Sequence, residues 1–79
     1  MKVPKFKLIP RTMCSDEQLD KMKAVIEKSY YAKVTTSGGI IVSSSDGSDF
    51  NLQDMQEITK LAEKTSGYIC FLKPLNPQQ

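Results

Sequence analysis

Two capped amphipathic helical segments alternate with short strand-like runs along this chain of 79 residues. The first helical segment follows Ser15, a good N-cap residue, with Gln18 three positions later to complete a capping box. The second follows Asn51, with Asp54 at the third helical position, and ends at Gly67, where glycine favours a left-handed C-terminal cap. Helices and strands in this alternation predict an α+β fold with one small core.

Each helical segment has an apolar stripe at the spacing of one helix face. In the first segment, which we expect to end near Ser29, the stripe consists of Leu19, Met22, Val25, Ile26 and Tyr30. In the second segment it consists of Leu52, Met55, Ile58, Leu61, Ala62 and Thr65. Phe50 and Met55 are spaced to form a hydrophobic staple across the second N-cap. We expect both stripes to face the core.

Four runs have the composition and period of β-strands, and they cover residues 5–9, 31–36, 40–43 and 68–73. In the first run, alternation places Phe6 and Leu8 on one face and the neighbouring lysines on the other. Gly38 and Gly39 separate the second and third runs by a short turn, which is typical of a β-hairpin. Pro74 is expected to end the fourth strand.

The succession strand, helix, strand, strand, helix, strand predicts a ferredoxin-like split βαβ arrangement, β-α-β-β-α-β, when its crossovers are right-handed. This fold has a four-stranded antiparallel sheet with two helices on one face, and here strands one and three would be central. We expect a single domain over residues 1–74 and a flexible C-terminal tail over residues 75–79.

Composition argues against an enzyme, a metal site and a bound cofactor. The chain has no histidine and only two cysteines, which are far apart in sequence. A calcium loop beginning at Asp46 fails because Phe50 and Asn51 stand where an oxygen ligand and a glycine are required. Cys14 precedes a helix, which can activate a thiol, but Asp16 and Glu17 at the start of that helix oppose activation, so we expect an unreactive thiol. An enzyme that uses Cys14 is the competing interpretation.

Charge and hydropathy do not identify the class of partner. The net charge is +2, and the ten lysines, one arginine and nine acids are spread along the sequence without a block of like charge. The first residues contain lysines where a signal peptide has an apolar run, and no stretch approaches the roughly 20 apolar residues that span a bilayer. We expect a cytoplasmic protein with no membrane partner.

The sheet face without helices is the candidate binding surface. Because lysine avoids burial, Lys5, Lys7 and Lys33 should point away from the helices, and strand alternation adds Tyr31 and Thr35. Strand three is apolar on both faces, so Ile41 should join Ile9 in an exposed apolar patch. The predicted partner-binding residues are Lys5, Lys7, Ile9, Tyr31, Lys33, Thr35 and Ile41.

A basic and partly apolar face of this kind predicts a small non-catalytic protein-binding or regulatory module that uses the open sheet face or the edge of strand two. Self-association into a homodimer would cover the same apolar patch. The alternative is a nucleic-acid-binding module that uses the same lysines. That alternative lacks the stacking aromatic residues that sheet-type RNA binders place on their central strands.

Overall fold

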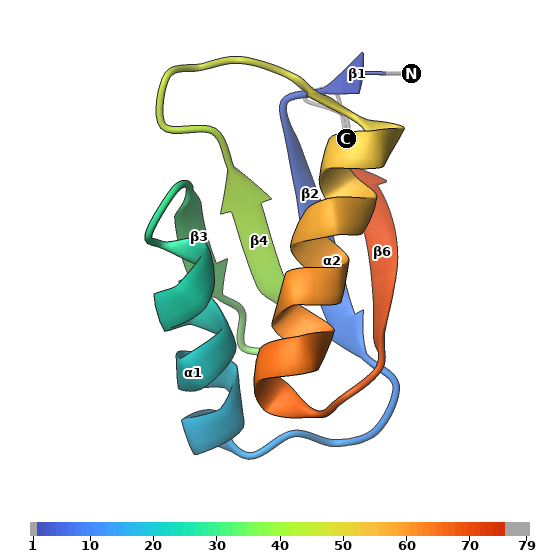
Figure 1. Ribbon diagram of the computed structural model, residues 1–79. Helices are drawn as coiled ribbons and strands as arrows, with labels where there is room; N and C mark the ends of the chain where they lie inside the picture. The colour runs from blue at the N-terminus through green and yellow to red at the C-terminus, as the bar shows by residue number, and fades with distance from the viewer. Residues whose placement is uncertain (1, 76–79) are drawn as a thin grey trace.

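The computed structural model describes residues 2–75, which form a small single-domain α+β fold with six strands and two helices (Figure 1). The elements follow in the order β1 (Lys2–Val3), β2 (Lys5–Pro10), α1 (Asp16–Ile26), β3 (Tyr31–Val34), β4 (Ile40–Ser43), β5 (Phe50–Asn51), α2 (Leu52–Ser66) and β6 (Cys70–Leu75).

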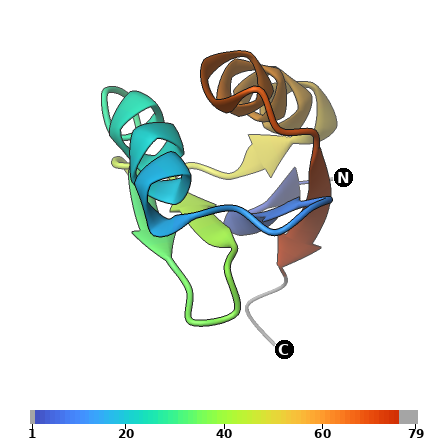
Figure 2. The ribbon, with the colours of Figure 1, turned by 90° about the horizontal axis from the view of Figure 1, so that it is seen from below.

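Four of the strands form one antiparallel sheet in the order β3-β4-β2-β6, so β4 and β2 are central and β3 and β6 are the edges. Both helices lie side by side on the same face of this sheet, and the opposite face has no helix over it (Figure 2). The hairpin between β3 and β4 projects toward that uncovered side.

The predicted succession of elements is wrong because it lacks two strands. β1 and β5 pair with each other in a separate antiparallel ribbon, with Lys2 opposite Asn51 and Val3 opposite Phe50. Each strand has only two residues, which is too short for an alternating pattern to be recognised in the sequence. The ribbon connects residues 2–3 to the segment that immediately precedes α2.

Two predicted boundaries extend too far. Helix α1 ends at Ile26, not near Ser29, because the chain turns there: the backbone N–H of Ser29 donates to the carbonyl of Ile26 at 3.1 Å. Strand β3 ends at Val34, not at residue 36, because Thr35 begins the turn. The backbone N–H of Thr35 donates to the Gly39 carbonyl at 2.8 Å and closes the hairpin.

The fourth predicted strand is displaced toward the C-terminus. Strand β6 begins at Cys70, not at residue 68, and it continues through Pro74, which lies opposite Phe6. An edge strand tolerates proline where the missing N–H would face away from the sheet. Leu75 therefore belongs to β6 and not to a tail, whereas the other residues of the predicted tail, 76–79, lie outside the described residues.

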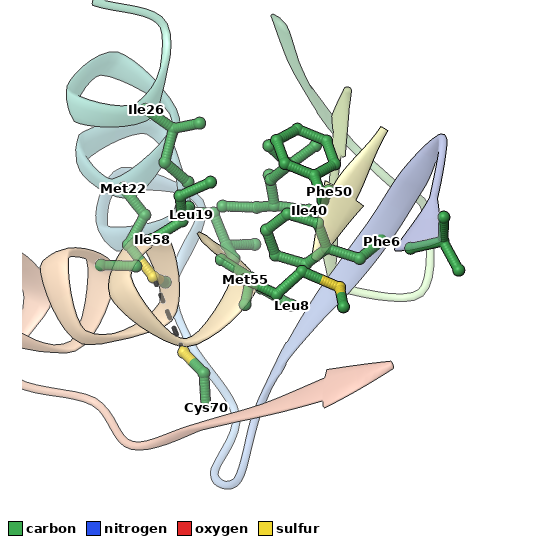
Figure 3. Close-up of a cluster of buried hydrophobic side chains, with 13 residues drawn as sticks. Phe6, Leu8, Leu19, Met22, Ile26, Ile40, Phe50, Met55, Ile58 and Cys70 are labelled. Carbon is green, nitrogen blue, oxygen red and sulfur yellow. Dashed lines mark hydrogen bonds between the residues drawn. The ribbon is translucent and has the colours of Figure 1, made fainter. Parts of the chain in front are cut away.

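The core lies between the helices and the covered face of the sheet (Figure 3). Phe6 and Leu8 are fully buried, which confirms the predicted orientation of β2. The ring of Phe50 meets the ring of Phe6 edge-on, with 5.1 Å between centroids, and lies 5.6 Å from the ring of Tyr30. These contacts join the β1–β5 ribbon, the sheet and the end of α1 into one core.

The N-cap at Ser15, the cap residues of α2 and part of each stripe are confirmed. The capping box predicted for α1 is only half formed: the Ser15 hydroxyl accepts the Gln18 N–H at 3.3 Å, but the Gln18 side chain makes no return bond to the Ser15 backbone. Asn51 and Asp54 form the expected capping box, and Gly67 has a φ of 79°. The buried stripe residues are Leu19, Met22 and Ile26 of α1, and Met55, Ile58 and Ala62 of α2. Three predicted members of the α2 stripe are exposed, namely Leu52, Leu61 and Thr65. Thr59 is buried instead, and its hydroxyl is satisfied there because it donates to the Met55 carbonyl at 2.7 Å.

Candidate functional site

The ladders of the four-stranded sheet group the outward side chains into rows, since cross-strand partners lie on one face. The middle row is Lys33, Ile41, Lys7 and Lys73, and the row beside it is Tyr31, Ser43, Lys5 and Leu75. On the other side of the middle row, Ile9 lies opposite Phe71. We call these ten side chains the open face.

Positive charge is concentrated on the open face. It holds Lys5, Lys7, Lys33 and Lys73, and the Arg11 guanidinium carbon lies 5.5 Å from the centroid of the Phe71 ring at its border. None of the nine carboxylates of the chain lies on the four strands of this sheet: all nine belong to the helices, their flanks or the loop between β4 and β5. A chain with a net charge of +2 thus has five cations at one face and an excess of acid elsewhere.

The open face also has apolar surface among its cations. Ile9 and Ile41, on the two central strands, are half-buried. The aromatic side chains stand at the two edges, where Tyr31 on β3 is 61% exposed and Phe71 on β6 is 55% exposed. The central strands have no aromatic residue on this face.

Six of the seven predicted partner-binding residues lie together on the open face. The seventh, Thr35, stands beside it in the β3–β4 turn. Its hydroxyl accepts the Gly39 N–H at 3.0 Å and lies 3.0 Å from the hydroxyl oxygen of Ser37. The Lys7 ammonium reaches the same serine and donates to its Oγ at 3.0 Å. Lys7 therefore joins the centre of the open face to the hairpin.

Four residues of this region are absent from the prediction, namely Arg11, Ser37, Phe71 and Lys73. Alternation alone does not decide which side of β6 faces the helices, but the reluctance of lysine to be buried, applied to Lys73, places Phe71 on the open face as well. The absence of acids from every strand-like run is a second signal in the sequence, and it indicates a sheet face without negative charge. Nothing in the sequence signals the contact of Lys7 with Ser37, because it depends on how the hairpin projects.

Burial disfavours the thiolate form of both cysteines. Burial raises the pKa of Cys14 above its ordinary value, which is the opposite of what a catalytic thiol needs. Burial, with a smaller contribution from the nearby Glu63 carboxylate, raises the pKa of Cys70 to about 11. The Cys70 thiol lies in the core, 4.0 Å from the sulfur of Met22 (Figure 3).

Within residues 2–75, no group of three or more histidine, cysteine or acidic side chains is arranged to hold a metal ion. Over the same residues, neither helix combines the length and the apolar character needed to cross a membrane. Comparisons with models of protein families, with curated proteins and with solved structures give no match to this chain.

Proposed function

We propose that this protein is a small non-catalytic binding or regulatory module whose open face binds an acidic and partly apolar surface of another protein. The separation of charge supports this most strongly, because five cations gather on one face that has no carboxylate on its strands. Such a face attracts an oppositely charged partner and selects against a positively charged one. Half-buried Ile9 and Ile41 between the lysines supply the apolar contact that a specific interface needs.

A second copy of this chain is a poor partner for the open face. Face-to-face pairing would bring two sets of five cations together, and like charges at an interface oppose association. Burial of Ile9 and Ile41 would have to offset that repulsion. An acidic partner gains from both the charges and the apolar side chains, so it is the better match.

Nucleic acid is the second candidate, and the same charge separation favours it. The positions of the aromatic residues argue against nucleic acid. Tyr31 and Phe71 stand on opposite edges, separated by three strand spacings, or about 14 Å across the sheet. Successive bases of a single strand stack much closer together than that, so this pair cannot form a continuous stacking platform. A nucleic acid would be held through its phosphates alone.

For the fold, we propose that the four-stranded sheet and its two helices form a ferredoxin-like split βαβ unit to which the β1–β5 ribbon is added. The antiparallel order β3-β4-β2-β6 and the placement of both helices on one face support this. We also propose that the protein acts in the cytoplasm. Two cysteines that form no disulfide fit a reducing compartment.

Charge reversal on the open face tests the proposed function. Lys7, Lys33 and Lys73 lie in the middle row, so we would change all three to glutamate and use the variant as bait in a host lysate, with and without nuclease. We expect the wild-type chain to retain a protein partner after nuclease treatment, and the variant to lose it.

The matched control reverses three exposed lysines outside the sheet, Lys28, Lys60 and Lys64, which produces the same net charge. This control should retain the partner. Equal loss from both variants would mean that net charge alone matters, and retention by the open-face variant would exclude that face. Loss of all captured protein on nuclease treatment would instead support the nucleic-acid function.

A further inference from the structure

The side chain of Lys7 lies against the β3–β4 hairpin because Gly39 leaves room for it. Gly39 has no side chain, and a Cβ atom there would lie 2.7 Å from Cε of Lys7, so the lysine stem passes over this position. The Lys7 ammonium then reaches Ser37, whose Oγ lies 3.0 Å from the Thr35 hydroxyl. A lysine ammonium has three N–H donors, so donation to Ser37 leaves two of them for another acceptor.

Next to this cluster is a cavity of about 280 Å³, which we call the hairpin pocket. Ser37 and Gly38 line it from the hairpin, Ile9 lines it from β2, and Arg11 and Thr12 line it from the loop before α1. One wall therefore holds a serine that the Lys7 ammonium contacts. The other wall includes the only arginine of the chain.

Two contacts hold Arg11 in position, one through its backbone and one through its side chain. Its backbone N–H donates to the Ile69 carbonyl at 2.8 Å, and its guanidinium group lies over the Phe71 ring. An arginine that stacks on an aromatic ring loses less freedom when it binds an anion, and its planar donors match the oxygens of a phosphate. Among residues 2–75, the one ion pair joins Lys21 to Glu17, so no carboxylate neutralises Lys7 or Arg11.

We propose that the hairpin pocket binds a phosphate monoester, in the form of a phosphorylated serine or threonine of the partner protein. This inference rests on the proposed function and identifies the group that the partner presents. A phosphate monoester has a charge between about −1.5 and −2 at neutral pH, which matches the two cations Lys7 and Arg11. The hydroxyls of Ser37 and Thr12 are further donors at the walls.

The pocket fits a monoester better than the phosphodiester of a nucleic acid. A monoester ends in three free oxygens that can enter a pocket with donors on two sides. A phosphodiester has one charge, and the chain continues from it in both directions, so it requires an open groove. The middle row of the open face would then contact the acidic surroundings of the phosphorylated residue.

Amide shifts of the full-length, isotope-labelled chain test this site with defined probes. O-phosphoserine and inorganic phosphate should both shift the amides of Ser37 and Gly38 with millimolar affinity, whereas L-serine should not. The Lys7→Met variant keeps the stem over Gly39 and removes the ammonium, so phosphoserine affinity should fall about tenfold, as expected for the loss of a charged hydrogen bond.

Lys73→Met is the matched control, because Lys73 lies opposite Lys7 on the open face, whereas only Lys7 donates to Ser37 in the wall of the pocket. It should change phosphoserine affinity less than about twofold, since exposed charges are screened. Equal weakening by Lys7→Met and Lys73→Met would overturn the site, as would the absence of shifts at Ser37 and Gly38.

Treatment of the lysate with phosphatase separates this inference from the proposed function. Loss of the captured protein after treatment supports a phosphorylated partner. Undiminished capture overturns that inference and leaves the binding role of the open face in place. If phosphoserine binds the pocket but no protein survives nuclease treatment, the proposed function fails and the site stands.

Discussion

Phe50 is the residue whose loss should affect folding most, because it joins several elements. It lies immediately before the N-cap of α2 and is 3% exposed. Its ring contacts Phe6 on β2 at 5.1 Å and Tyr30 after α1 at 5.6 Å, and its backbone pairs with Val3. Removal of this ring leaves a cavity where the ribbon, the sheet and both helices meet.

The expected effect of Phe50→Ala follows from these contacts. Removal of a buried phenylalanine usually costs about 3–5 kcal/mol, and each aromatic pair accounts for about 0.5–1.5 kcal/mol within that loss. A chain of this length has a total stability of about 4–12 kcal/mol. Phe50→Ala should therefore remove at least about a quarter of the stability. Phe50→Leu fills most of the space and should lose about 1–2 kcal/mol, chiefly from the two ring contacts.

Urea unfolding followed by circular dichroism measures these losses. With a slope of about 1 kcal/mol per molar urea for a small protein, the midpoint for Phe50→Ala should fall by about 3–5 M. Phe71→Ala is the matched control, because Phe71 is 55% exposed on the open face and should lose no more than about 1 kcal/mol. A loss below about 1 kcal/mol for Phe50→Ala, or an equal loss for Phe71→Ala, would show that the core is not built around Phe50.

Three further changes have defined outcomes. Asn51→Ala removes the side chain of the α2 capping box and should lower the free energy of unfolding by about 1 kcal/mol in urea; no loss would exclude the cap. Gly39→Ala places a methyl group 2.7 Å from Cε of Lys7 and 3.0 Å from the Leu8 carbonyl oxygen, and it should weaken phosphoserine binding at Ser37 while the far-ultraviolet spectrum stays unchanged; unaltered affinity would contradict the lysine path. The pKa of the Cys70 thiol is raised to about 11, so below the unfolded value near 8.5 its contribution to stability is complete, and it is lost as the pH rises through 11. Cys70→Ala should flatten this part of the stability curve, and identical curves would contradict the raised pKa.

Periodicity and capping residues predicted much of the fold. Ser15, Asn51 and Gly67 marked helix ends that the structure confirms, and the alternation at Phe6 and Leu8 oriented β2 correctly. These features depend on residues a few positions apart, so a sequence pattern can reveal them.

Features that depend on distant contacts were not predictable in the same way. Val3 and Phe50 form a ribbon only because the two segments meet in space, and a two-residue strand has no period. Thr59 is buried, where its hydroxyl bonds to the preceding turn, while Leu61 at the predicted apolar stripe remains 44% exposed. Small rotations of a helix decide such cases, and the stripe alone does not specify them.

Part of the candidate site was predictable from the sequence, and part of it was not. Lysine's preference for water correctly oriented Lys5, Lys7 and Lys33, because it acts at each position separately. The hairpin pocket joins Arg11, from the loop before α1, to Ser37 in the β3–β4 turn. Only the assembled sheet and its projecting hairpin bring those two residues to one cavity.

A titration of the isotope-labelled chain with a synthetic peptide of six glutamates locates the surface that prefers acidic partners. The largest amide shifts should occur at Lys7, Ile41, Lys33 and Lys73, in the middle row of the open face, and they should diminish as salt screens the charges. Shifts concentrated on α1 and α2, or no shifts on the sheet at low salt, would contradict a binding role for the open face.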